Sequence, residues 1–149
     1  MKSLSAKRLG FSLIELLVVL LVVGLLSGGI IVAARKAVVS AKAVRITSDL
    51  NTLKLAYLMY SVDFGDHEAL LSDLTLLEPY LDSRIDENQY VICTEDDSIY
   101  IGTGPFNKNI LLQLEKQASE TGLYNSSSSQ PPVSPYDPEK GPWVWVKVQ

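Results

Sequence analysis

The sequence contains one cysteine and one histidine among its 149 residues, and this scarcity limits the chemistry that the chain can perform. A single cysteine excludes an intramolecular disulfide, because that bond needs two thiols. Cys93 lies in an apolar run and is expected to be a small buried core residue, whereas His67 is expected to be a polar turn residue. No nucleophile elbow, phosphate-binding loop or metal-ligand spacing surrounds either side chain. The sequence therefore predicts a protein that is not an enzyme, and an anchored periplasmic enzyme would need a reactive pocket around one of these two residues.

Charge is almost absent from residues 11–34, where Glu15 is the only ionisable side chain. At 1.5 Å per residue a helix of this length spans ~36 Å, which is enough to cross a hydrocarbon core of ~30 Å. An ordinary secretory signal has a shorter apolar core and a cleavage site of small residues after it. We therefore predict a membrane-spanning helix. A carboxylate within it costs at least ~2.5 kcal/mol on insertion scales, so Glu15 is expected to have a partner, most simply an amine.

The residues around Gly10 resemble a known processing motif. The segment from Lys7 to Val19 reads KRLGFSLIELLVV, a basic leader that ends in glycine before an apolar run with one glutamate. It is similar to the cleavage and methylation motif of type IV prepilins and of the pseudopilins of type II secretion and competence systems. The resemblance implies that a membrane peptidase cuts after Gly10 and methylates the new N-terminus at Phe11. It also implies that Glu15 neutralises the Phe11 ammonium of a neighbouring subunit during filament assembly.

The same resemblance implies a function, a location and partners. The chain would be a structural subunit of a type IV pilus-like filament or of a type II secretion pseudopilus. It would cross the bacterial inner membrane once, with its head outside the cytoplasm, and would then enter a pilus or a periplasmic pseudopilus. The implied partners are membrane lipid before assembly, prepilin peptidase, an assembly platform with its ATPase, and copies of itself or related pilins. The alternative is a monotopic periplasmic binding or sensor domain on an uncleaved signal anchor, which would retain residues 1–10.

Positive charge is scarce beyond Arg45, where 6 basic residues stand against 16 acidic ones. Phosphate binding depends on clustered cations, so no nucleic-acid partner is expected for this acidic region. The cations that follow the apolar segment form a basic collar: Arg35, Lys36, Lys42 and Arg45.

The apolar pattern predicts that the helix continues past residue 34. Apolar residues recur at alternating four- and three-residue steps, which keeps them on one face: Val39, Ala43, Ile46, Leu50, Leu53, Tyr57 and Tyr60. A mostly polar set is expected on the opposite face: Arg35, Lys42, Arg45, Asp49 and Lys54. The predicted organisation is a cleaved leader (1–10), a transmembrane and filament-core helix (11–34), its amphipathic continuation (35–61) and a small α+β head (62–149).

Within the head, a leucine-rich segment over 69–81 has roughly helical spacing, and residues 109–121 predict a further helix that stops at Gly122. Two β-rich runs, 89–94 and 99–103, flank an acidic tip and predict a hairpin. Residues 125–138 are expected to be a surface loop, and residues 143–148 a last strand with Trp143 and Trp145 on one face. The expected fold class is α+β and pilin-like, with a long N-terminal helix packed on a small antiparallel sheet with inserted helices.

A second resemblance concerns metal binding. The end of the predicted long helix, an Asp and Gly turn and the leucine-rich segment that follows resemble the major pseudopilin of type II secretion, a subfamily that binds calcium in a C-terminal loop. Asp137 and Glu139 are the calcium candidates that this resemblance implies. Calcium prefers six to eight oxygen ligands, and the Asp/Gly-rich loop of that subfamily is missing here. Our prediction is therefore no resident cofactor, with these two carboxylates as weak candidates, and the sequence leaves pilus, pseudopilus and competence system open.

Overall fold

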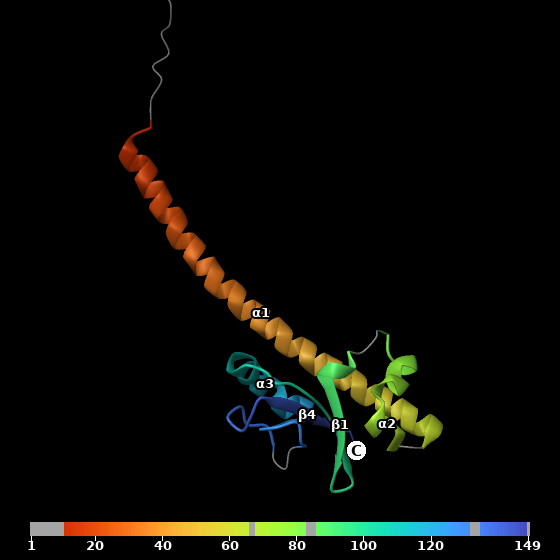
Figure 1. The fold of residues 1–149 in the computed structure, drawn as a ribbon. Coiled ribbons are helices and arrows are strands. Elements are labelled where there is room, and N and C mark those ends of the chain that lie inside the picture. The colour runs from red at the N-terminus through yellow and green to blue at the C-terminus, as the bar shows by residue number, and fades with distance from the viewer. Residues whose placement is uncertain (1–10, 66–67, 83–85, 132–134, 149) are drawn as a thin grey trace, which may run out of the picture. The chain divides into compact units, whose positions relative to one another are not determined.

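The computed structural model describes residues 11–65, 68–82, 86–131 and 135–148 (Figure 1). Gly10 and His67, two residues on which sequence predictions fall, lie outside the described residues. The chain divides into two compact units, residues 1–38 and residues 39–149.

The described part of the first unit is the beginning of helix α1 (Leu13–Phe64). Its apolar side chains are largely exposed, and Leu13, Ile14 and Ile30 are 81%, 68% and 69% exposed. An exposed apolar surface of this extent is unfavourable in water. α1 confirms the predicted long helix, which runs without a break through its glycines at positions 24, 28 and 29.

The second unit contains a four-stranded antiparallel sheet. Its strands are β1 (Tyr90–Glu95), β2 (Ser98–Thr103), β3 (Leu123–Ser126) and β4 (Trp143–Lys147), and their order in the sheet is β1-β2-β4-β3. Together with α1 this sheet confirms the predicted pilin-like α+β fold.

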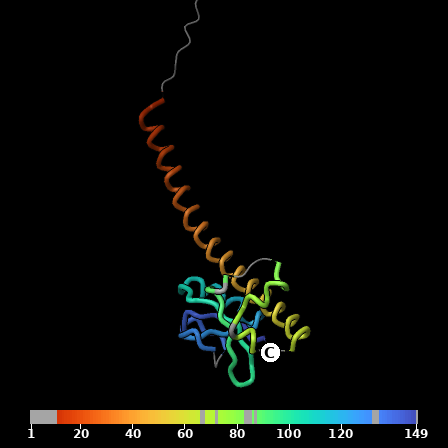
Figure 2. The backbone as a smooth tube through the Cα atoms, turned by 45° about the vertical axis from the view of Figure 1, so that its right-hand side comes forward, coloured from red at the N-terminus to blue at the C-terminus, as the bar shows by residue number. Residues whose placement is uncertain are grey.

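The hairpin of β1 and β2 is confirmed (green in Figure 2). Asp96 and Asp97 form its two-residue tip with φ angles of 48° and 59°. Two positive φ angles match the twist of the strands in a tight hairpin, and aspartate tolerates them better than most residues. Both side chains are exposed, as expected for a solvated tip.

The leucine-rich segment, whose spacing is roughly helical, is divided into two short helices. It forms a short α2 (Glu68–Ser72) followed by the 3₁₀ helix η1 (Leu74–Tyr80). Asp73 separates them, because its side chain accepts a hydrogen bond from the backbone N–H of Thr75 at 2.9 Å and starts a new helix. Pro79 within η1 has no N–H to donate, so a regular α-helix is disfavoured there.

The predicted helix before Gly122 is confirmed as α3 (Lys108–Thr121). Asn107 caps its start by accepting a hydrogen bond from the N–H of Ile110 at 3.1 Å. Gly122 ends it with φ 63° and ψ 38°, a left-handed conformation that glycine adopts without a steric penalty. A further 3₁₀ turn, η2 (Glu87–Gln89), leads into β1.

The core of the second unit lies between α1, the sheet and α3. The predicted apolar face of α1 is confirmed, since Leu50 and Tyr57 are fully buried and Val39 and Ile46 are partly buried against the core. Trp145 on β4 is also fully buried and lies opposite Gly102 on β2. A Cβ atom at position 102 would approach the Trp145 ring to 2.3 Å, so the ring occupies the space that any other residue would need.

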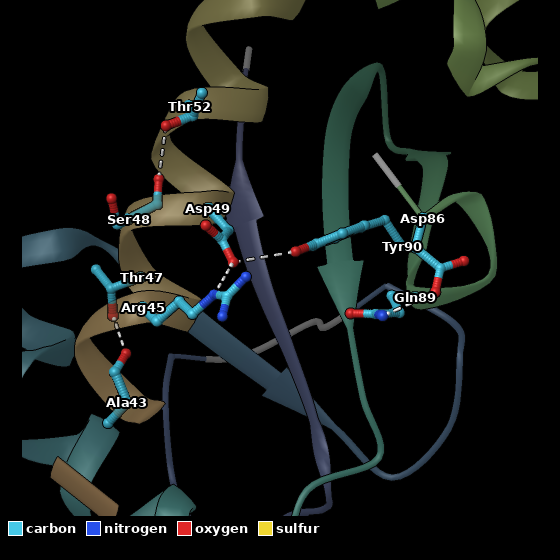
Figure 3. A network of polar contacts seen from close by, with 9 residues as sticks. All are labelled: Ala43, Arg45, Thr47, Ser48, Asp49, Thr52, Asp86, Gln89 and Tyr90. Carbon is cyan, nitrogen blue, oxygen red and sulfur yellow. Dashed lines mark hydrogen bonds and ion pairs between the residues drawn. The ribbon is translucent and has the colours of Figure 1, made fainter. Parts of the chain in front are cut away.

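Two residues of the predicted polar face of α1 point toward the sheet instead. Asp49 accepts a hydrogen bond from the Tyr90 hydroxyl at 3.3 Å and lies 3.7 Å from the Arg45 guanidinium (Figure 3). Lys54 donates to the backbone carbonyl of Lys147 at 2.9 Å. Positions 49 and 54 lie at the two margins of the buried face, where a 3.6-residue repeat brings polar side chains within reach of the sheet. Burial and then the Asp49 carboxylate raise the pKa of Tyr90.

Candidate processing and assembly site

The first turn of α1 places the Glu15 carboxylate next to the backbone that precedes the helix. The N–H of Ser12 donates to Glu15 Oε2 at 2.9 Å, and the N–H of Leu16 donates to the Ser12 carbonyl at 3.2 Å. A serine followed three residues later by glutamate is the sequence pattern of a capping box, in which the glutamate reaches back to the start of the helix. The negative charge also lies at the positive end of the helix dipole.

This hydrogen bond holds the Glu15 carboxylate at the backbone of Ser12, the residue that directly follows Phe11. Phe11 precedes α1, and its side chain is 86% exposed. Gly10, on the other side of the expected cleavage point, lies outside the described residues. Glu15 stands out in the sequence by its charge within the apolar run and by its place in the prepilin-type motif, and the Ser12 to Glu15 spacing is the signal that predicts its hydrogen bond.

Residues 5–31 match the family model of the prokaryotic N-terminal methylation motif. This is the prepilin-type cleavage motif of type IV pilins and pseudopilins. No curated protein and no solved structure shows significant similarity to this chain. The chain therefore carries a prepilin-type cleavage and methylation motif at the start of a long apolar helix.

Among the described residues, one helix is long and apolar enough to cross a membrane, and it is α1. The apolar window within it is not buried against any other part of the chain. Motif and helix together support a type IV pilin-like or pseudopilin protein that is processed by prepilin peptidase, and they are consistent with anchoring in a membrane.

The two calcium candidates have other partners. Asp137 Oδ1 accepts a hydrogen bond from the N–H of Glu139 at 3.0 Å, and Glu139 Oε1 lies 3.6 Å from the Lys108 ammonium. No group of three or more His, Cys, Asp or Glu side chains among the described residues is placed to hold a metal ion. A cation at this loop would have to compete with Lys108 for Glu139.

Asn125 fixes the loop that contains these carboxylates. Asn125 is the first residue of the predicted surface loop, and that prediction is wrong at this position, because Asn125 belongs to β3 and is 2% exposed. Its Oδ1 accepts from the N–H of Asp137 at 2.9 Å, and its Nδ2 donates to the carbonyls of Asp137 and Gly141. A buried amide without partners is costly, so these bonds hold the returning chain against the sheet. A Ser- and Pro-rich neighbourhood gives no signal of this role.

Cys93 is half-buried, which corrects the expectation of a fully buried core residue. β1 is an edge strand, and Ile92 occupies its buried position, so the next side chain points to the other face. Burial and then the Glu95 carboxylate raise the pKa of the Cys93 thiol to about 11.

We expect Cys93 to react slowly with iodoacetamide at pH 8 in the folded protein. The thiolate is the reactive form, and a pKa of about 11 instead of 9.0 lowers its fraction by roughly 100-fold at this pH. The alkylation rate, followed by intact mass, should rise by about that factor when the protein is unfolded in urea. Because this is the only cysteine in the chain, one added group reports on it alone. Equal rates in the two states would contradict the prediction.

Proposed function

We propose that this chain is a structural subunit of a type IV pilus-like filament or of a secretion pseudopilus. The observation that carries the proposal is the match of residues 5–31 to the methylation motif, which includes the start of the exposed apolar helix α1. Prepilin peptidase cuts between Gly10 and Phe11, and Phe11 becomes the methylated N-terminus. Residues 11–34 then form the membrane-spanning and later the filament-core helix, residues 35–61 continue it, and residues 62–149 form the head.

Glu15 acts in assembly by pairing with the new ammonium group of Phe11 on a neighbouring subunit. The Ser12 to Glu15 hydrogen bond supports this role, because it holds the carboxylate at the end of the helix where that amine is made. In low dielectric, a charge without a partner is expensive and an opposite charge nearby is strongly attractive. The pair therefore sets the axial register of neighbouring helices more than it adds stability.

The precursor is anchored in the bacterial inner membrane by one span with the head outside the cytoplasm. Its mature form is extracted into a growing filament by an assembly platform that a cytoplasmic ATPase drives. Its chemistry is assembly and not catalysis: apolar faces that lipid covers before assembly are covered afterwards by neighbouring copies or related pilins.

The test is the intact mass of the native protein in two fractions, filaments sheared from the cell surface and washed membranes. We expect a species that begins at methylated Phe11. Its presence in the sheared filaments would identify a surface pilin, and its restriction to membranes would favour a pseudopilus. A chain that retains residues 1–10 in both fractions would overturn the proposal and favour the signal-anchored binding or sensor domain.

A further inference from the structure

The second unit contains an open cavity of about 810 Å³, which is lined by α1, the start of β1 and the segment that joins β2 to α3. Its most buried lining residues are apolar, since Leu53 and Ile110 are 3% and 7% exposed, and Ile46 and Phe106 are partly buried beside them. Protein interiors rarely leave space of this size, and ligand pockets measure ~300–1,000 Å³. The cavity is therefore a candidate binding site that the processing motif does not explain.

Thr103 places a hydroxyl group in the wall of this cavity. The residue ends β2 and is 5% exposed. Its hydroxyl is bonded to none of the described residues, although every sealed polar side-chain atom among them has a partner. The hydroxyl is therefore not sealed, and the cavity is the space into which it opens. A polar ligand group at this point would be favourable, because a buried hydroxyl without a partner costs free energy.

Two walls of the cavity carry opposite charges. Lys42 and Arg45 on α1 form the cationic wall, and Asp82 and Asp86 before β1 form the anionic wall. Figure 3 shows Arg45 near the hydroxyl end of the Tyr90 side chain and Asp86 near its backbone end. Lys42 and Asp82 form no ion pair or hydrogen bond with any residue in the described part of the chain. One charge on each wall is thus available to a ligand.

An extended peptide fits this lining better than simpler ligands do. A lone anion would meet the cationic wall and leave two carboxylates facing it, and a metal ion finds no group of three His, Cys, Asp or Glu side chains among the described residues. A free amino acid carries its ammonium and carboxylate on one carbon atom, so it cannot reach both walls. A peptide carries acidic, basic and apolar side chains on separate residues, and its backbone can bond to the Thr103 hydroxyl.

We propose that this cavity binds an extended peptide segment of another protein. An acidic side chain of the peptide faces the cationic wall, a basic side chain faces the anionic wall, and an apolar side chain between them covers Leu53 and Ile110. A backbone group of the peptide satisfies the Thr103 hydroxyl. This role goes beyond the structural one proposed above and does not depend on cleavage after Gly10, because all the lining residues belong to the second unit.

The test is an affinity selection on the full chain in detergent micelles, with a library of hexapeptides as the probe. Each peptide has blocked termini and two charged positions filled by glutamate or lysine, and its other positions are filled by alanine, serine, leucine or phenylalanine. We expect the retained peptides, identified by mass spectrometry, to carry one glutamate and one lysine in a fixed order and spacing. The Kd of the best peptide is then measured by fluorescence anisotropy.

Three variants of the lining test the assignment of the walls. Thr103→Val keeps the shape of the side chain and should weaken binding by ~2- to 10-fold, the effect of one neutral hydrogen bond. Lys42→Glu and Asp82→Lys should each weaken binding by more than ~10-fold, because each places a like charge against the peptide. A repeated selection on Lys42→Glu should retain peptides with lysine in place of the glutamate.

Lys116→Glu is the matched control, because Lys116 is an exposed lysine on α3 that does not line the cavity. It should bind the best peptide as the unsubstituted chain does. The melting temperature of each variant shows whether the second unit is still folded. The inference is overturned if no peptide is retained, if the retained peptides carry charge of one sign only, or if folded Thr103→Val and Lys42→Glu bind as tightly as the control. Each of these results leaves the proposed filament role standing.

Discussion

Replacement of Glu15 by valine is expected to leave membrane insertion intact and to reduce incorporation into filaments by more than ~100-fold. Removal of one partner from a buried ion pair costs about 3–5 kcal/mol, and each 1.4 kcal/mol is a factor of ten in an association constant. Insertion should not suffer, because valine is less costly than a carboxylate in a membrane-spanning helix. The measurement is the amount of the chain in sheared filaments relative to washed membranes.

Two further variants separate the charge of Glu15 from its shape and position. Glu15→Gln keeps the size of the side chain and can still accept the hydrogen bond of the Ser12 N–H, yet it cannot neutralise an ammonium group. We expect it to fail in assembly as Glu15→Val does. Leu17→Val changes an exposed apolar residue in the same turn region and should assemble normally. Assembly of Glu15→Gln at the level of the unsubstituted chain would show that the charge has no role in register.

The largest effect on stability is expected for Trp145→Ala. Trp145 is fully buried, its ring fills the space over Gly102, and its indole N–H donates to Ser126 Oγ at 2.8 Å. Truncation of a buried tryptophan to alanine costs about 3–5 kcal/mol, because it removes apolar burial and leaves a cavity. For a unit of this size we expect the melting temperature of the detergent-solubilised full chain to fall by more than ~10 °C.

Trp143→Ala is the matched control for this prediction. Trp143 stacks on Trp145 with ring centroids 6.2 Å apart, which places both rings on one face of β4 as the sequence predicts. Trp143 is only partly buried, so its truncation leaves less of a cavity and should cost less than half as much as Trp145→Ala. Equal losses of stability in the two variants would contradict the prediction, because the stacking of the two rings would then contribute as much as the packing of Trp145 over Gly102.

Local periodicity explains how much of the fold was predictable. The 3.6-residue repeat of apolar side chains gave the buried face of α1 from Val39 to Tyr60, and short-range caps such as Asn107 and Gly122 set the limits of α3. The two-residue tip at Asp96 and Asp97 likewise depends on neighbours in sequence. The leucine spacing indicated helical structure in the 69–81 segment, but it did not indicate the division into α2 and η1, which the Asp73 cap and Pro79 impose.

The candidate site was also a matter of local sequence. Gly10, Phe11 and Glu15 stand out because one charge interrupts a long apolar run behind a basic leader, and residues 5–31 match a family model on that pattern alone. Their roles in cleavage and assembly stay predictions for the experiments above.

The sequence by itself determined the apolar helix, its processing motif, the phase of its buried face and the α+β class. Only the tertiary structure decided which polar residues turn inward. Lys54 bonds to the carbonyl of Lys147, 93 positions away, and Asn125 holds a loop 12 and 16 positions further on. It also decided that the Trp145 ring lies over Gly102. The physical reason is range: periodicity and caps act over a few residues, whereas a buried polar group is satisfied by whichever backbone the fold brings beside it.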